Sequence, residues 1–148
     1  MKVEIRDAKF DPWQEVKSYQ DLQLNKPGKF GATAVFIGTM RDFNKGNEIF
    51  SMYLEHYPEM TQNHLLQIAQ EAADRWEILD VLLLHRTGRV FPGEPIVCIA
   101  VWSAHRAAAY EANLFIMEDL KSKAPIWKKE NLKTQERWVP GKQGKPIL

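Results

Sequence analysis

Cysteine is almost absent from this chain of 148 residues, in which Cys98 is the single example. An intramolecular disulfide and a zinc site with several cysteine ligands are therefore excluded, which fits a reducing compartment. Long apolar runs are absent as well. None approaches the roughly 20 residues that a membrane-spanning helix needs, and the N-terminus alternates apolar with charged residues instead of carrying the apolar core of a signal peptide. These absences predict a soluble, cytoplasmic protein that does not associate with membranes.

An excess of charge of one sign is missing too, because 20 lysines and arginines oppose 19 aspartates and glutamates and leave a formal net charge of +1. A nucleic-acid-binding protein needs a strong basic excess, so an RNA-binding domain is disfavoured. The histidines at 56, 64, 85 and 105 lack the HxxxH and HExxH spacings of metal sites. Glycine motifs for nucleotides and the GxSxG motif are absent as well. We therefore expect neither a metal nor a cofactor, and no serine hydrolase chemistry.

Periodic apolar patterns, in contrast, run through the whole chain and predict a single domain over residues 1–148, with 140–148 as a flexible tail. Strands are expected over 2–8, 32–39, 48–57, 78–88, 95–104, 126–130 and 136–140. Helices are expected over 11–20, 58–76 and 104–123, and the loop 41–47 is long for a tight hairpin. This order predicts an α+β domain with an antiparallel or mixed sheet, two long helices and one short N-terminal helix, rather than a doubly wound sheet.

The motif SAHRAAAYE, which begins at Ser103, predicts an anion-binding group. Ser103 is expected to cap the third helix, which places His105 and Arg106 in the first helical turn. The helix macrodipole is positive there and disfavours a cation, so a bound phosphate or carboxylate would explain both side chains. The alternative is structural: Arg106 pairs with a nearby carboxylate, and His105 is an ordinary surface histidine.

Lysines near the end of the same helix predict a second cationic group, formed by Lys121 and the segment PIWKKE that follows it. A lysine close to other cations and desolvated by Trp127 has a lowered pKa, which suits a general acid, a base or a nucleophile near neutral pH. The period of a strand places Lys128 with Ile126 on one face and Lys129 on the other, so only one of the tandem lysines can join Lys121. The alternative is an edge strand whose lysines prevent edge-to-edge pairing.

Arg41 and Cys98 are two further residues whose side chains could bind a ligand or react. Arg41 follows a strand that ends in Gly-Thr and lies in a glycine-containing loop, which is a common place for a binding residue, although a solvated charge is the ordinary alternative. Cys98 lies in mid-strand among apolar neighbours, with no adjacent charge to lower its thiol pKa. We therefore expect Cys98 to be a core residue rather than a nucleophile.

The distance between the two cationic groups constrains how they can cooperate. His105 and Lys121 are 16 residues apart on one predicted helix, and a rise of 1.5 Å per residue separates their backbones by about 24 Å. One small ligand can hardly touch both within one chain. A shared site therefore predicts a homodimer, in which two copies supply opposite ends of their helices to one pocket.

The motifs GTMRDFNKG, YLEHYPEM, HRTGRVFPGE, SAHRAAAYEA and LKSKAPIWKKE, followed by RWV, resemble in order and spacing those of the large, catalytic subunit of molybdopterin synthase. The similarity runs from about residue 3 to residue 139. It implies an α/β-hammerhead fold and a central homodimer that binds two copies of a small ubiquitin-like sulfur carrier, which gives a heterotetramer. The carrier ends in a Gly-Gly thiocarboxylate, and its tail enters a pocket of the large subunit.

The same resemblance implies a sulfurtransferase of molybdenum cofactor biosynthesis. Such an enzyme adds two sulfurs to cyclic pyranopterin monophosphate, also called precursor Z, and forms the dithiolene of molybdopterin. The family's motifs assign the catalytic role to Lys121 and Lys128, and the binding of the phosphate and pterin to Arg41, His105 and Arg106. The motifs also imply that Thr39, Met40, Lys129 and Glu130 line the same pocket. The alternative is a non-catalytic anion-binding scaffold that recruits a ubiquitin-like partner, which predicts carrier binding without turnover.

Overall fold

The computed structural model describes residues 1–132 and 136–139. Its helices are α1 (Pro12–Ser18), the π-helix η1 (Tyr19–Leu24), α2 (Pro58–Arg75) and α3 (Arg106–Lys123). Its strands are β1 (Lys2–Arg6), β2 (Ala32–Thr39), β3 (Phe43–Asn44), β4 (Asn47–His56), β5 (Asp80–Arg86), β6 (Gly88–Val90), β7 (Pro95–Ser103), β8 (Ile126–Leu132) and β9 (Glu136–Trp138). Within these residues, no helix has the length and apolarity to cross a membrane. The tail predicted over 140–148 lies outside the described residues.

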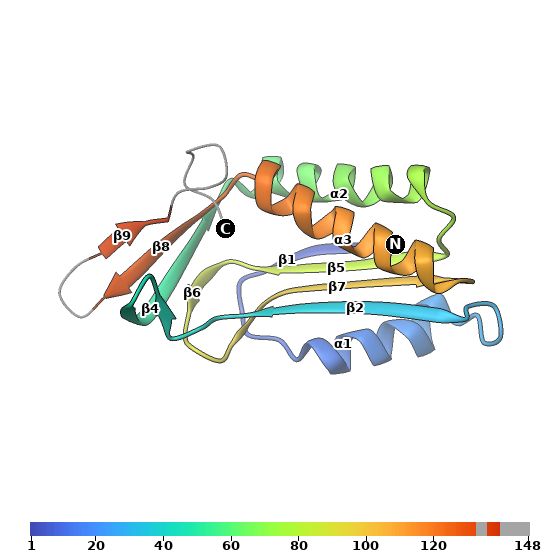
Figure 1. Ribbon diagram of the computed structural model, residues 1–148, viewed down its shortest axis with the longest axis horizontal. Helices are drawn as coiled ribbons and strands as arrows, with labels where there is room; N and C mark the ends of the chain where they lie inside the picture. Colours follow the sequence, from blue (N-terminus) through green and yellow to red (C-terminus); the bar gives the residue numbers. More distant parts are fainter. Residues whose placement is uncertain (133–135, 140–148) are drawn as a thin grey trace.

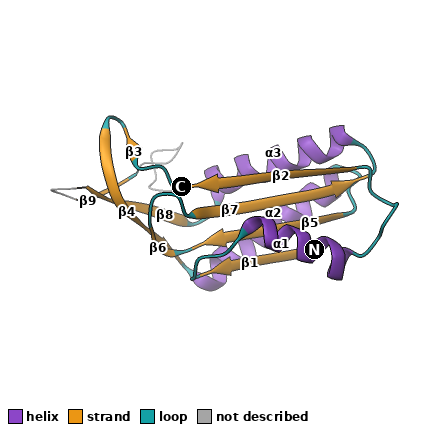
Figure 2. Ribbon diagram, turned by 90° about the horizontal axis from the view of Figure 1, so that it is seen from below, coloured by secondary structure: helices purple, strands orange, loops and turns teal. Residues whose placement is uncertain are grey.

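The strands form two sheets (Figures 1 and 2). The first has the order β1-β5-β7-β2, with β1 parallel to β5 and the other neighbours antiparallel. The second has the order β3-β4-β8-β9, all antiparallel, and β6 also pairs with β4. The predicted α+β class is confirmed, and its strands are divided between a mixed sheet and an antiparallel one.

Both faces of the first sheet are covered: α2 and α3 lie on one face and α1 on the other, as Figure 1 shows. Because side chains alternate along a strand, β5 and β7 contribute to two separate clusters. The cluster beneath α2 and α3 takes Val81, Leu83, Val97, Ile99 and Val101. The cluster beneath α1 and η1 takes Leu82, Leu84, Cys98, Ala100 and Trp102. Neither face of these strands meets water, which explains their nearly continuous apolar sequences.

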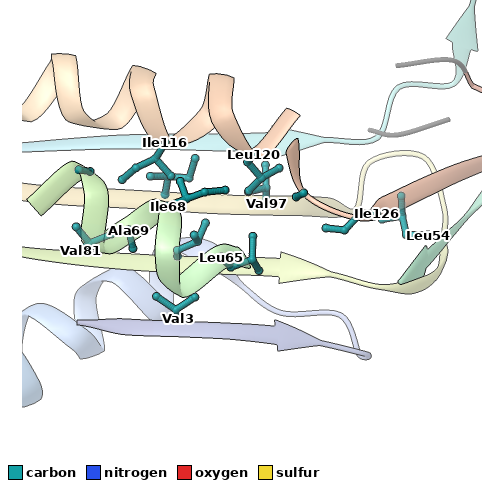
Figure 3. Close-up of a cluster of buried hydrophobic side chains, with 14 of the residues drawn as sticks. Val3, Leu54, Leu65, Ile68, Ala69, Val81, Val97, Ile116, Leu120 and Ile126 are labelled. Atoms are coloured by element: carbon teal, nitrogen blue, oxygen red, sulfur yellow. The ribbon is translucent and has the colours of Figure 1, made fainter. Parts of the chain in front are cut away.

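The two long helices bury one stripe each against this sheet. Figure 3 shows Ile68 and Ala69 of α2 gathered with Ile116 and Leu120 of α3 over Val97. The buried residues of α2 recur at intervals of three and four, as the sequence predicts: Thr61, Leu65, Ile68, Ala69 and Ala72. Ala73, four residues after Ala69, is only half-buried.

The first helix begins as predicted and ends early. Asp11 accepts hydrogen bonds from the backbone N–H groups of Trp13 and Gln14 at 3.0 and 3.3 Å, and Pro12 takes the first helical position. The α-helix ends at Ser18 instead of residue 20 and continues as the π-helix η1, whose last residue is followed by a left-handed Asn25.

The predicted start of the third helix is wrong by two residues. Ser103 is the last residue of β7, where it pairs with Ala32 and accepts a hydrogen bond from Gly31 N–H at 3.0 Å. Its hydroxyl donates to the carbonyl of His105 and does not cap the helix. His105 takes the N-cap position without a side-chain hydrogen bond, and α3 begins at Arg106. The backbone pairing of β7 therefore keeps Ser103 in the strand, although serine is a favourable N-cap residue.

The loop 41–47 contains a tight hairpin that the sequence analysis did not predict. Phe43 pairs with Glu48 and Asn44 with Asn47, which leaves two residues in the turn. Lys45 and Gly46 both have positive φ, 51° and 77°, as a type I′ turn requires. Lysine is an unusual first residue for this turn, which explains why the sequence did not indicate it.

Candidate functional site

The face of β8 that carries Lys128 forms one wall of a pocket. β8 runs antiparallel to β4, with Lys128 opposite Leu54 and Glu130 opposite Met52. Alternation along the strand puts Ile126, Lys128 and Glu130 on one face, and both Ile126 and Glu130 are only 1% exposed. The end of β2, the β3–β4 hairpin and β8 close the pocket, which includes Thr39, Met40, Arg41, Asn44, Lys128 and Glu130.

The end of β2 brings three predicted residues, Thr39, Met40 and Arg41, to this pocket. The Met40 N–H donates to the carbonyl of Glu94 at 3.0 Å, and the Met40 side chain is buried. Arg41 is exposed, and its guanidinium lies 5.0 Å from the centre of the Phe43 ring. The backbone is thus held in place while the guanidinium stays accessible to a ligand.

Glu130 is buried but has a partner for each carboxylate oxygen. Arg137 Nε donates to Oε1 at 2.7 Å, and Asn44 Nδ2 donates to Oε2 at 3.0 Å. Arg137 Nη2 also donates to the Asn44 carbonyl at 3.1 Å. Sequence analysis predicted Glu130 but neither of its partners, which come from β9 and β3.

Lys128 is partly buried and close to other cations, as the sequence analysis expected, but Trp127, the residue expected to desolvate it, lies on the other face of β8 against the Tyr57 ring. Burial lowers the pKa of Lys128 from the ordinary value, and the positive charges of Arg41 and Lys121 lower it further, while Glu130 opposes them. A lysine with a lowered pKa gives up its proton closer to neutral pH. Arg41 lines the same pocket as Lys128, and Lys121 lines a second pocket that shares Thr39 and Ile96 with the first, so a single chain supplies all three cations.

Lys121 is exposed at the end of α3 and lines a second, more apolar pocket with Phe36, Thr39, Ile96 and Met117. Thr39 and Ile96 line the first pocket as well, so the two adjoin. The sequence analysis missed Phe36, Ile96 and Met117. Because β2 is apolar at every position from residue 34 to 37, its sequence does not indicate which side chain faces a pocket.

The structure does not bring His105 and Arg106 to these pockets. Both are exposed at the start of α3, which Figure 1 shows at the end of the molecule away from β4, β8 and β9. The helix is continuous from Arg106 to Lys123, so the predicted separation of about 24 Å within one chain holds. These two residues can join Lys121 only from another copy of the chain.

Lys129, which was expected to line the same pocket, lies on the other face of β8. Its ammonium pairs with Glu136 at 2.6 Å and lies 5.6 Å from the centre of the Trp138 ring. The alternation of the strand accounts for this position, since Lys128 faces the pocket.

Cys98 is fully buried in β7, and burial raises its thiol pKa to about 12. A thiol with so high a pKa does not form the thiolate that a nucleophile needs at neutral pH. The prediction that Cys98 is a core residue is confirmed. Among the described residues, no group of three or more His, Cys, Asp or Glu side chains is arranged to hold a metal ion.

Comparison with known proteins identifies the family. The family model described as "MoaE protein" matches residues 5–123 of the chain. The chain belongs to the MoaE family. The molybdopterin synthase catalytic subunit of Pseudomonas aeruginosa is 47% identical over 142 residues, which are 96% of this chain and 92% of that protein. The corresponding subunit of Escherichia coli is 43% identical over 113 residues, 76% of this chain and 75% of that protein.

Solved structures of MoaE-type proteins share the fold. The crystal structure of molybdopterin synthase from Staphylococcus aureus superposes with a TM-score of 0.82 at 32% identity, covering 94% of this chain and 98% of that chain. The predicted family, fold class and sulfurtransferase activity in molybdenum cofactor biosynthesis are thereby confirmed.

Proposed function

We propose that this chain transfers sulfur from the C-terminal thiocarboxylate of a small ubiquitin-like carrier to precursor Z, and so forms the dithiolene of molybdopterin. The observation that carries the proposal is the cationic pocket, in which Lys128 is desolvated and lies near the charges of Arg41 and Lys121. The substrate carries a phosphate and the carrier ends in an anion. Both need positive charge where they meet, and a partly desolvated pocket makes that charge effective.

Lys121 and Lys128 form the catalytic pair. Their ammonium groups stabilise the thiocarboxylate and the oxyanions that leave during sulfur transfer. Lys128 also moves protons, because its lowered pKa brings its neutral form closer to neutral pH. Arg41 binds the phosphate beside them from the end of β2.

The sulfur comes from outside the chain. Cys98, the single cysteine, is buried in the core with a raised thiol pKa, so it supplies no sulfur nucleophile. The name of the relatives, catalytic subunit, implies a further subunit in the same enzyme. A carrier with a terminal thiocarboxylate fits this requirement, and two carriers on a central homodimer give a heterotetramer. A cytoplasmic location fits a chain with one cysteine and no disulfide.

A second copy of the chain completes the pocket with His105 and Arg106. A groove between β2 and α3 is lined by Phe36, Tyr110 and Leu114, whose side chains are 40%, 69% and 63% exposed. Lys121 lines both this groove and the second pocket, which adjoins the first. Two α3 helices packed antiparallel about a twofold axis would cover both grooves. This arrangement sets the start of each helix beside the end of the other and brings His105 and Arg106 to the partner's Lys121.

The test is reconstitution from purified parts. The chain is mixed with thiocarboxylated carrier and precursor Z, and the dithiolene product is measured. Lys121→Ala should lower product formation by about a hundredfold or more, the scale of losing a group that stabilises transition-state charge, while folding and carrier binding stay near those of the parent. The variant Lys17→Ala, an exposed position on α1, which covers the opposite face of the first sheet from α3 (Figure 1), serves as the control. Full activity of Lys121→Ala would refute the catalytic role, and carrier binding by the parent chain without turnover would favour the scaffold.

A further inference from the structure

Arg137 is a side chain of β9 that joins three elements around the pocket. β9 pairs with β8 so that Arg137 lies opposite Glu130, and the Val139 N–H donates to the carbonyl of Lys128 at 2.9 Å. The guanidinium holds the Glu130 carboxylate with Nε and the Asn44 carbonyl with Nη2, at 2.7 and 3.1 Å. One side chain therefore connects β8, β9 and the β3–β4 hairpin.

The Glu130 carboxylate is the charge that Arg137 controls. It is 1% exposed and lies two residues from Lys128 on the same face of β8. Both oxygens are directed to other partners, Arg137 and Asn44. A buried carboxylate that loses such a partner is drawn to the nearest remaining cation. Lys128 is two residues away on the same face of β8 and lines the same pocket, so Lys128 is the cation to which Glu130 would turn.

We propose that Arg137 is a positioning residue for sulfur transfer: by holding Glu130 and Asn44, it keeps the Lys128 ammonium free for an anionic ligand and keeps the hairpin closed over the pocket. The reaction in this statement rests on the proposed function. The arrangement of charges does not, since it is a property of the folded chain alone.

Burial has the largest influence on the pKa of Lys128, and three charged side chains act on it as well, while Arg137 acts through one of them. Glu130 acts from the same strand, Arg41 from the loop after β2 and Lys121 from the end of α3. Arg137 reaches Glu130 from β9. Replacing Arg137 with an apolar residue removes a positive charge and at the same time releases Glu130 toward Lys128. Both changes favour the protonated form of Lys128 and act in the same direction.

The experiment is a titration of Lys128 by NMR, on the full chain labelled with ¹³C at the lysine side chains and without substrate. Lys128→Arg assigns the signal. Arg137→Met should raise the pKa of Lys128 above that of the parent, whereas Glu130→Gln should lower it, because it removes the attracting negative charge. The opposite signs separate this inference from general loosening of the structure, which would move both variants the same way. An unchanged Lys128 pKa in a folded Arg137→Met variant would overturn the inference.

Two variants, Arg137→Lys and Glu130→Gln, keep the test decisive if Arg137→Met fails to fold. Arg137→Lys retains the charge but cannot bridge Glu130 and the Asn44 carbonyl at once. The pKa of Lys128 should then rise less than in the methionine variant. Glu130→Gln should lower the pKa of Lys128, and this measurement does not depend on Arg137→Met. Glu136→Gln is the matched control, because Glu136 lies next to Arg137 on β9 and pairs outward with Lys129 at 2.6 Å. A pKa change in this control as large as in Arg137→Met would count against the inference.

Activity provides the second measurement. Arg137→Met should reduce dithiolene formation at neutral pH by about tenfold or more, the scale of misplacing a group at an active site. If Lys128 acts as its neutral form, the rise of activity with pH should move to higher pH by the same amount as the NMR titration. A shift in the titration with no change in the pH profile would overturn the role of Arg137 in the reaction. A parent chain that makes no dithiolene would instead contradict the proposed function and leave the titration result intact.

Discussion

Lys128, which we propose as a catalytic residue, occupies a position that folding disfavours. Burial lowers its pKa in the fold below 10.5, the ordinary value that applies to the unfolded chain. Between the two pKa values the unfolded chain therefore binds more protons, and the free energy of unfolding rises with pH across that window. Below the window the full cost of burying the ammonium is present. Above it the lysine is neutral in both states and the cost disappears.

Lys128→Met should consequently stabilise the fold at neutral pH while it abolishes activity. Methionine keeps the apolar stem and removes the poorly solvated charge, and the gain should be of the size common for stabilising substitutions, about 0.5–2 kcal/mol. Urea unfolding at pH 7 and at pH 10.5 measures it, and the advantage should shrink at the higher pH. A lower free energy of unfolding than that of the parent at pH 7 would show that burial of the Lys128 ammonium does not destabilise the fold.

At the scale of elements, α3 has two faces with different tasks. Its inner face buries Ala109, Ala112, Ile116 and Leu120, and the last two are labelled in the cluster of Figure 3. Its outer face carries Tyr110 and Leu114, which remain exposed beside β2. The inner face stabilises the chain, and the outer face is the surface through which we propose that two chains meet.

Ile116→Ala should destabilise the chain by about 2–5 kcal/mol, because it opens a cavity in a fully buried cluster. Lys123→Ala, on the exposed side of the same helix, removes an ion pair with Asp119 and should cost no more than about 0.5 kcal/mol. Chemical unfolding followed by circular dichroism compares the two. Equal losses would mean that helix propensity, and not burial, determines the contribution of α3.

Local patterns predicted these elements well wherever one face is buried. The stripe through Ala112, Ile116 and Leu120 identifies α3, and strand alternation correctly placed Lys128 and Lys129 on opposite faces of β8. The helix start was misplaced because the β7 ladder, which no local pattern reveals, extends to Ser103.

The supporting contacts of the pocket could not be predicted in the same way. Asn44 and Glu130 are 86 positions apart and meet only because β3 and β8 flank β4. Arg137 is close to Glu130 in sequence, but a lone arginine before a tryptophan gives no sign of a buried partner. Phe36 and Met117 likewise come together from β2 and α3. Such pairs depend on sheet order, which periodicity does not determine.

At the scale of the whole molecule, the separation of the two cationic groups allows a test of the shared site. Lys121→Ala and Arg106→Ala should each be nearly inactive alone, since every site then lacks one group. In a mixed dimer, one site lacks both groups and the other is intact. Random exchange makes about half of the dimers mixed, so the mixture should recover about a quarter of the parent activity. The dithiolene assay after unfolding and refolding the two variants together measures this recovery.

The matching control is to refold each variant by itself, which should restore nothing. Recovery that is absent from the mixture, although sedimentation shows mixed dimers, would mean that each site draws all its residues from one chain. The structure argues against that outcome, because α3 is continuous between the two groups.

Because α3 is continuous, its length determines the distance and the relative rotation between the two cationic groups. One added residue would advance the start of the helix by 1.5 Å and rotate it by about 100° relative to its end, turning the guanidinium of Arg106 away from the neighbouring subunit's lysine. In the proposed dimer the twofold axis would repeat this change, so both active sites would lose their alignment at once. The length of this helix should therefore tolerate far less change than the loops around it.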